Sequence, residues 1–197
     1  MNTKDNLISD YIERSIQTKK ELQKTRVEVI AQVAVLIVDA YRQGKKVVWF
    51  GNGGSAADAQ HLACELVSRF YLERRALASI AFTTNTSELT AIANDYNFDQ
   101  IFARQVEALV NQGDIVIGIS TSGKSQNVIN GIKKAKQLGA ITIAFTGATG
   151  GKLKGNVDFL LDVPSEITPH IQESHIMIGH IICYLVEKEL FGDINEK

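Results

Sequence analysis

The chain has 197 residues and a formal net charge of −1, with 45% hydrophobic and 22% charged residues. This length favours one domain, and the near-neutral charge gives no general attraction to nucleic acid. The sequence shows no membrane-length apolar run and no signal-peptide core, and its two cysteines are too few for a disulfide framework, so we expect a cytoplasmic protein.

The first 43 residues have the apolar spacing of a helix, with isoleucines at every fourth position over 8–16 and an apolar stripe over 30–41. Residues 25–28 fit a capping box, so a second helix is predicted to begin there, and Gly44 ends it. This helical arm could cover one face of a sheet or pack against copies of itself. Its first half is sparsely apolar, which favours packing against copies.

From residue 45 onward, apolar runs alternate with helical segments. Strands are predicted over 47–50, 78–82, 115–119, 141–145 and 157–161. Helices are predicted near 55–71, 87–93, 98–111, 125–138 and 151–154, and from Thr168 and Pro169 to about residue 190. The pattern predicts an α/β protein: a three-layer α/β/α, flavodoxin-like domain with a five-stranded parallel doubly wound sheet. We divide the chain into an N-terminal helical arm for oligomerisation (1–44) and this domain (45–197).

Polar loops follow the predicted strands, at the edge of the sheet where open α/β folds bind ligands. Gly51–Ser55 follows the first strand, and the hydroxyl-rich Ser120–Ser125 follows the third and precedes a helix. Free N–H groups and hydroxyls at a helix start can surround a phosphate. Neither loop has the spacing of a nucleotide-binding motif. We therefore predict a single phosphate on a small molecule; the alternative is that the hydroxyls only cap the helix.

Two ionisable residues lie within the helix that follows the glycine turn. His61 and Glu65 are four residues apart and share a face, which suits a metal site or an acid/base pair. A rival set pairs His61 with Cys64 and His180 with Cys183, which together would make a closed structural zinc site. The simpler interpretation of both cysteines is that they are small buried hydrophobes.

Five motifs together carry a family resemblance: GNGGSAADAQH, HLACE, AIANDYNF, GISTSGKSQNV and IQESHIMIGH. The chain resembles the sugar isomerase (SIS) domain family, in the branch that isomerises heptose phosphates. The resemblance implies a cytoplasmic homotetramer with active sites between subunits and one zinc ion per subunit. It also implies conversion of sedoheptulose 7-phosphate to D-glycero-D-manno-heptose 7-phosphate by enediol proton transfer, the first step of bacterial ADP/GDP-heptose synthesis for lipopolysaccharide.

The resemblance also assigns roles to residues. Its metal ligands match His61, Glu65, Gln172 and His180, and its catalytic acid/base pair matches Glu65 and His180. Its substrate contacts match Asn52, Gly53, Gly54, Ser55, Glu65, Asn94, Asp95, Ser120, Thr121, Ser122, Ser125 and Gln172. Arg69 matches a basic residue implied to reach the substrate.

Two points about these roles stay open. A residue bound to zinc is a poorer base, so either the metal shifts during turnover or zinc is partly structural. Gln172 and His180 are eight residues apart, about 12 Å of helical rise, which is near the limit for one ion. His175 could replace one of them, or ligands could come from two subunits; we favour a supporting hydrogen bond for His175. We expect His170 at the surface or the rim of the pocket and Trp49 in the core.

Other functions within this family remain alternatives. One relative is a non-catalytic tetrameric scaffold that binds the bacterial replication initiator, and others are regulators that only sense a sugar phosphate. Isomerases of other phosphosugars, such as arabinose 5-phosphate, share the fold. Because this chain has a carboxylate and an imidazole at positions 65 and 180, we favour an enzyme.

Overall fold

The structure is a computed structural model, and it describes residues 3–192. The helices are α1 (Thr3–Arg42), α2 (Gly54–Val67), α3 (Thr86–Asp95), α4 (Ile101–Leu109), α5 (Gln126–Gln137) and α6 (Thr168–Phe191), with a short 3₁₀ helix at Phe98–Gln100. The strands are β1 (Val47–Gly51), β2 (Ser79–Ala81), β3 (Ile115–Ile119), β4 (Ile141–Thr146) and β5 (Phe159–Asp162).

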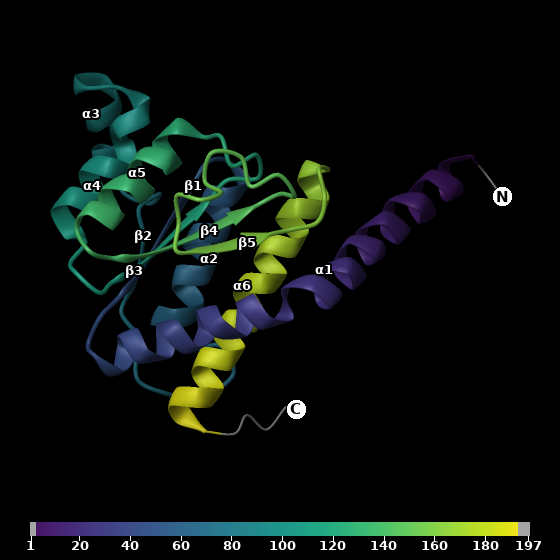
Figure 1. Cartoon of the computed structure of the whole chain (residues 1–197), viewed down its shortest axis with the longest axis horizontal. Coiled ribbons are helices and arrows are strands. Elements are labelled where there is room, and N and C mark those ends of the chain that lie inside the picture. The colour runs from purple at the N-terminus through teal and green to yellow at the C-terminus, as the bar shows by residue number, and fades with distance from the viewer. Residues whose placement is uncertain (1–2, 193–197) are drawn as a thin grey trace.

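The five strands form one parallel sheet in the order β2-β1-β3-β4-β5, which confirms the predicted doubly wound architecture (Figure 1). All residues of β1 and β3 are buried, as expected for strands covered on both faces. The chain order reverses between β1 and β3. Their carboxyl ends therefore form the switch point where α/β sheets bind ligands.

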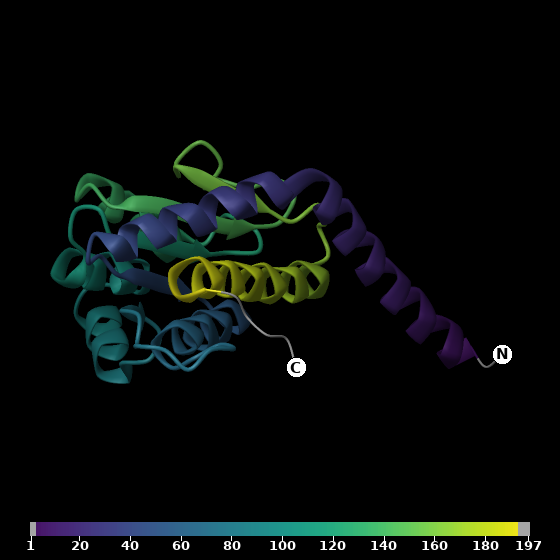
Figure 2. The same ribbon diagram turned by 90° about the horizontal axis from the view of Figure 1, so that it is seen from below.

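Helices cover both faces of the sheet (Figures 1 and 2). The second half of α1, together with α2 and α6, packs against the face that includes Val47 and Trp49, and α4 and α5 pack against the face that includes Val48 and Phe50. Trp49 is fully buried, and its indole nitrogen donates to Ser79 Oγ at 3.0 Å. This confirms its predicted place in the core.

The N-terminal helix differs from its prediction. α1 is one continuous helix of 40 residues, so the second helix predicted at Thr25 is wrong. The Thr25 hydroxyl donates to the Glu21 carbonyl one turn earlier instead of capping a new helix. The second half of α1 lies in the core, whereas the first half extends away from the domain with Leu7, Ile8 and Ile12 exposed (Figure 2). Residues 1 and 2 of the predicted arm lie outside the described residues.

Some predicted boundaries moved. α2 ends at Val67, because the backbone N–H groups of 70–72 bond to the Glu187 carboxylate instead of continuing the helix. The predicted short helix at 151–154 is a series of turns, and β5 begins two residues later than expected. Thr168 is the first residue of α6 rather than its cap. Among the described residues, we find no helix of the length and apolarity that a membrane span requires.

Candidate active site

The glycine turn after β1 brings the start of α2 close to α6. Gly53 has a φ of 56°, a left-handed conformation that favours glycine. A Cβ on Gly54 would lie 2.6 Å from Nε2 of Gln172, so the glycine leaves room for the end of this α6 side chain. The Asn52 and Asn127 amides exchange two hydrogen bonds of 2.9 Å. These bonds tie the turn to the beginning of α5.

The loop after β3 presents hydroxyls at the N-terminus of α5. Ser120 is buried, and its Oγ lies 3.0 Å from Ser125 Oγ. Ser125 precedes α5, but its side chain makes no capping hydrogen bond to the helix. The first N–H groups of α5 and these hydroxyls therefore offer the donors that an anion requires.

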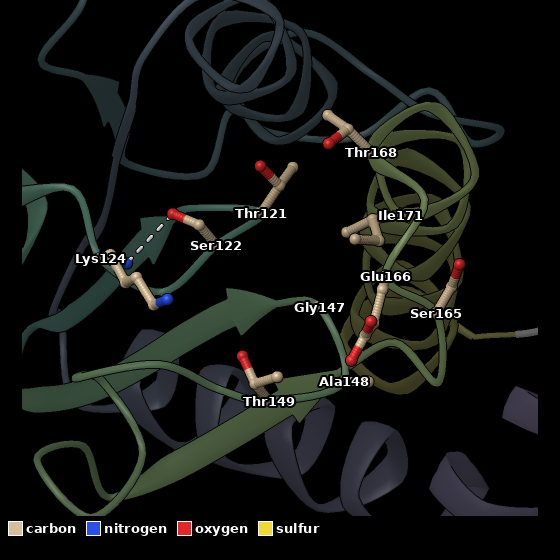
Figure 3. Close-up of a pocket in the computed structure, with 10 residues that line it drawn as sticks. All are labelled: Thr121, Ser122, Lys124, Gly147, Ala148, Thr149, Ser165, Glu166, Thr168 and Ile171. Carbon is tan, nitrogen blue, oxygen red and sulfur yellow. Dashed lines mark hydrogen bonds between the residues drawn. The ribbon is translucent and has the colours of Figure 1, made fainter.

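A cavity of about 340 Å³ opens beside this loop, and we call it the serine-loop cavity (Figure 3). Backbone hydrogen bonds of 2.8 Å from Gly147 N to Thr121 O and from Lys152 N to Gly123 O hold the loops after β3 and β4 together. The two charged residues of the cavity, Lys124 and Glu166, lie on opposite sides of a group of hydroxyls (Figure 3). The lining residues are Thr121, Ser122, Lys124, Gly147, Ala148, Thr149, Ser165, Glu166, Thr168 and Ile171.

Further along α2 and α6, two imidazoles and a carboxylate converge. His61 Nε2 lies 3.0 Å from Glu65 Oε1 and 2.9 Å from His180 Nε2, and the three ligand atoms are all within 4.8 Å of one another. Burial and nearby His61 lower the pKa of His180, while Glu65 acts in the opposite direction. A lowered pKa favours the neutral imidazole that binds a metal. Two nitrogens and one carboxylate oxygen, with a position left open, suit a catalytic transition-metal site.

A buried ion pair joins the segment that follows α2 to α6, beyond this cluster. Arg74 Nε donates to Glu187 Oε1 at 2.9 Å, and the exposed fractions of the two side chains are 2% and 1%. Arg74 also donates to the carbonyl oxygen of Glu65 at 2.9 Å. Burial alone would raise the pKa of Glu187, but hydrogen bonds from the N–H groups of 70–72 and from Arg74 hold the pKa below its usual value.

The structure brings together some predicted site residues and separates others. His61, Glu65 and His180 meet within one chain, whereas Gln172 lies beside Gly54, two turns earlier in α6. Gln172 and His180 are therefore far apart along α6, as their eight-residue spacing predicted. Asn94 and Asp95 lie on exposed α3; Asp95 lines a separate hollow between α3 and α4, away from the start of α6 (Figure 1).

The other histidines are structural. His175 is fully buried, its Nε2 lies 3.0 Å from the Thr146 carbonyl oxygen, and burial lowers its pKa to about 4. His175 therefore makes a hydrogen bond, but to a backbone carbonyl rather than to a member of the metal cluster, which within this chain it does not join. The prediction that His170 lies at the surface is wrong: it is 1% exposed, with its ring centroid 4.6 Å from that of Tyr11 on α1.

The rival zinc set is also wrong. Cys64 is exposed and Cys183 is buried, and neither belongs to the metal-ligand cluster found among the described residues. The simpler interpretation holds for Cys183 only. Burial raises the pKa of the Cys183 thiol to about 12, which disfavours the thiolate that binds zinc. Arg69 is exposed and pairs with Glu73 at 3.3 Å.

Sequence reasoning missed several residues near the site. The loops after β4 and β5 contribute Thr149, Ser165 and Glu166 to the serine-loop cavity. Thr149 lies in the glycine-rich TGATGGK stretch (146–152) that follows the fourth predicted strand, which is a signal for a binding loop, whereas no motif marks the other two residues. Asp58 was also not predicted from the sequence, although the spacing of Asp58 from Gly54 and His61 places all three residues on the same side of α2.

Comparisons with known proteins agree with this geometry. The profile of the SIS domain family matches residues 10–147. The chain belongs to the SIS domain family. The matched residues include the second half of α1, the glycine turn and the loop after β3.

Similar SIS domain proteins cover nearly the whole chain. The phosphoheptose isomerase of Clostridium acetobutylicum is 54% identical over 190 residues, which are 95% of this chain and 97% of the relative. The solved phosphoheptose isomerase of Neisseria gonorrhoeae superimposes with a TM-score of 0.90 at 42% identity, over 94% of this chain and 100% of its own. That of Francisella tularensis gives 0.91 at 40% identity, over 95% and 100%.

Proposed function

We propose that this chain is a phosphoheptose isomerase that converts sedoheptulose 7-phosphate to D-glycero-D-manno-heptose 7-phosphate. The observation that carries the proposal is the convergence of Glu65 and His180 from separate helices, in a chain that is 54% identical to the phosphoheptose isomerase of Clostridium acetobutylicum. The loop after β3 supports a phosphate site. Its hydroxyls and Lys124 line the serine-loop cavity, opposite the Glu166 carboxylate, and the N-terminus of α5 begins directly after Ser125.

The reaction moves one proton between neighbouring carbons. In this proposal the Glu65 carboxylate removes a proton from C1 of the ketose, which gives a C1–C2 enediol, and then returns a proton to C2. His180 transfers the second proton between the two substrate oxygens. General acid–base catalysis of this kind contributes about 10²–10⁴-fold in rate.

The same residues support a zinc ion. His61, Glu65 and His180 would hold it. Their two nitrogens and one carboxylate oxygen fit zinc even without Gln172 as a fourth ligand. When bound, zinc supplies Lewis-acid polarisation of the substrate carbonyl. Gln172, beside the glycine turn, would contact the substrate between the cluster and the serine-loop cavity.

We further propose a homotetramer in the cytoplasm. The projecting half of α1 exposes Leu7, Ile8, Ile12 and Ile16, an apolar stripe that a second copy would cover. Asn94 and Asp95 would reach the site of a neighbouring subunit, because their own chain places them elsewhere. Light scattering coupled to size exclusion tests the tetramer. The free thiols of both cysteines suit a reducing compartment.

The deciding experiment is incubation of the purified chain with sedoheptulose 7-phosphate while NMR follows formation of the aldose. We expect turnover by the zinc-loaded protein, loss of turnover with a chelator, and recovery when zinc is restored. Ribulose 5-phosphate serves as the competing substrate and should turn over far more slowly. Faster turnover of ribulose 5-phosphate, or no turnover of either sugar, would reject the proposed function.

A further inference from the structure

Three residues of α2 form a stripe that faces α6. Gly54, Asp58 and His61 are spaced by four and then three residues, which keeps them on one side of a helix. Gly54 meets the Gln172 side chain, and His61 Nε2 meets His180 Nε2 at 2.9 Å. Asp58 therefore lies between these contacts, one turn before His61.

Asp58 presents a hydrogen-bond acceptor without a donor. Its carboxyl is partly buried, and Oδ2 is shielded from solvent with no partner among the described residues. On α6, the helical phase that brings Gln172 and His180 to this interface places the apolar Ile176 between them. An unpaired buried acceptor destabilises a fold by about 1–3 kcal/mol, so its presence requires an explanation.

His61 has a nitrogen that requires such an acceptor. Its Nε2 faces Glu65 and His180, so a neutral ring that binds an ion through Nε2 carries its hydrogen on Nδ1. Metal-bound histidines almost always donate this second N–H to a carboxylate, a carbonyl or water. Helical side chains lean toward the N-terminus, which brings the base of the His61 ring over the turn that holds Asp58.

Electrostatics supports the proximity of these two side chains. Burial raises the pKa of Asp58 to about 6, and the charge of His61 acts in the opposite direction. His61 therefore lies within electrostatic reach of the Asp58 carboxyl.

We propose that Asp58 is a positioning residue: Oδ2 accepts a hydrogen bond from His61 Nδ1 when zinc binds, and so keeps Nε2 turned toward the ion. The inference rests on the proposed function for the identity of the ion, and it assigns Asp58 no contact with substrate. Because Oδ2 is unpaired without the ion, removal of the carboxyl has different effects on zinc affinity and on the stability of the metal-free fold. It weakens zinc binding and leaves the metal-free fold equally or more stable.

The test compares Asp58→Ala, Asp58→Asn and the matched control Asp39→Ala, which removes an exposed aspartate from the helix α1. The full chain is stripped of metal, and its zinc affinity is measured by competition with a chelating dye. We expect Asp58→Ala to lose about 10–100-fold in affinity. Asp58→Asn should lose less, because a neutral acceptor forms the weaker hydrogen bond. Asp39→Ala should bind zinc like the unmodified chain.

Two further readouts separate this role from a structural one. In urea titrations of the metal-free proteins, Asp58→Ala should be at least as stable as Asp39→Ala. Long-range ¹H–¹⁵N NMR of the zinc-loaded chain should show a hydrogen on His61 Nδ1 that exchanges slowly with solvent, and exchange should become fast in Asp58→Ala.

Unchanged zinc affinity in Asp58→Ala would overturn the proposal. So would a metal-free Asp58→Ala less stable than its control, or an unmodified chain that binds no zinc. If Asp58→Ala loses zinc affinity as expected but the unmodified chain leaves sedoheptulose 7-phosphate unchanged, the role of Asp58 stands and the proposed isomerase function fails.

Discussion

The serine-loop cavity and the interface between α2 and α6 are built by different means. The cavity is formed by loops after β3, β4 and β5, and it offers mainly hydroxyls, together with the charged side chains of Lys124 and Glu166. The helical interface offers ionisable side chains, His61, Glu65 and His180, on elements fastened by the buried Arg74–Glu187 pair. Rigid helices hold reacting groups precisely, whereas loops provide adaptable binding groups. The difference separates binding from chemistry, and variants in each region should have separable effects.

The largest expected effect comes from Glu65→Gln, which removes the base from the helical interface and leaves the cavity intact. We expect kcat to fall about 10²–10⁴-fold while KM changes little, because phosphate binding is retained. Steady-state kinetics with sedoheptulose 7-phosphate measures both constants, and size exclusion checks that the oligomer persists. Glu107→Gln, at an exposed site on α4, is the matched control. Retained turnover by Glu65→Gln would exclude Glu65 as the base.

The fold could be predicted from the sequence because its signals are local. Each buried strand is a short apolar run bounded by turn residues, and β3 matches its predicted bounds at both ends. The predicted break at Thr25 was wrong because the same residues that form a capping box also continue a helix once tertiary packing favours it. Propensity at such positions is weak compared with packing.

The candidate site could be predicted only in part. The His61–Glu65 pair follows from a spacing of four residues, while the role of His180 came from the family resemblance. The buried His170 packs against Tyr11, and the Arg74–Glu187 pair joins residues 113 positions apart. No local pattern specifies contacts of this kind.

The second prediction loosens the interface that holds the reacting groups. Arg74→Met leaves the Glu187 carboxylate buried without its partner, which should reduce the free energy of unfolding by about 3–5 kcal/mol. Urea denaturation measures the change. The double variant Arg74→Met/Glu187→Gln buries no charge and keeps a side-chain oxygen that can accept from the N–H groups of 70–72, so it should recover part of the lost stability. A single variant as stable as the unmodified chain would show that α2 and α6 are held by other contacts.

The third prediction concerns His175, which joins the two regions through the carbonyl of Thr146, next to the cavity residue Gly147. Burial lowers its pKa from 6.5 to about 4. The unfolded chain therefore takes up a proton below pH 6.5 that the folded chain does not. The stability from this residue is complete above pH 6.5 and falls by about 3 kcal/mol as the pH decreases to 4.

His175→Asn keeps a donor for the Thr146 carbonyl but does not titrate. Its urea midpoint should therefore depend less on pH between 6.5 and 4 than that of the unmodified chain. Identical pH profiles would show that His175 titrates normally in the folded protein.

The smallest expected effect comes from the cavity. Ser122→Ala removes a hydroxyl that accepts a hydrogen bond from Lys124 N at 3.2 Å and lines the proposed phosphate site. Loss of one hydrogen bond to a charged group should raise KM for sedoheptulose 7-phosphate about tenfold. We expect kcat to stay within about twofold, because the reacting groups lie on the helices and the bond to phosphate is made equally in ground and transition states. Ser9→Ala, at an exposed position in the projecting first half of α1, controls for the substitution itself. A fall in kcat with constant KM would mean that the cavity takes part in the chemistry, and the separation between the two regions would then be wrong.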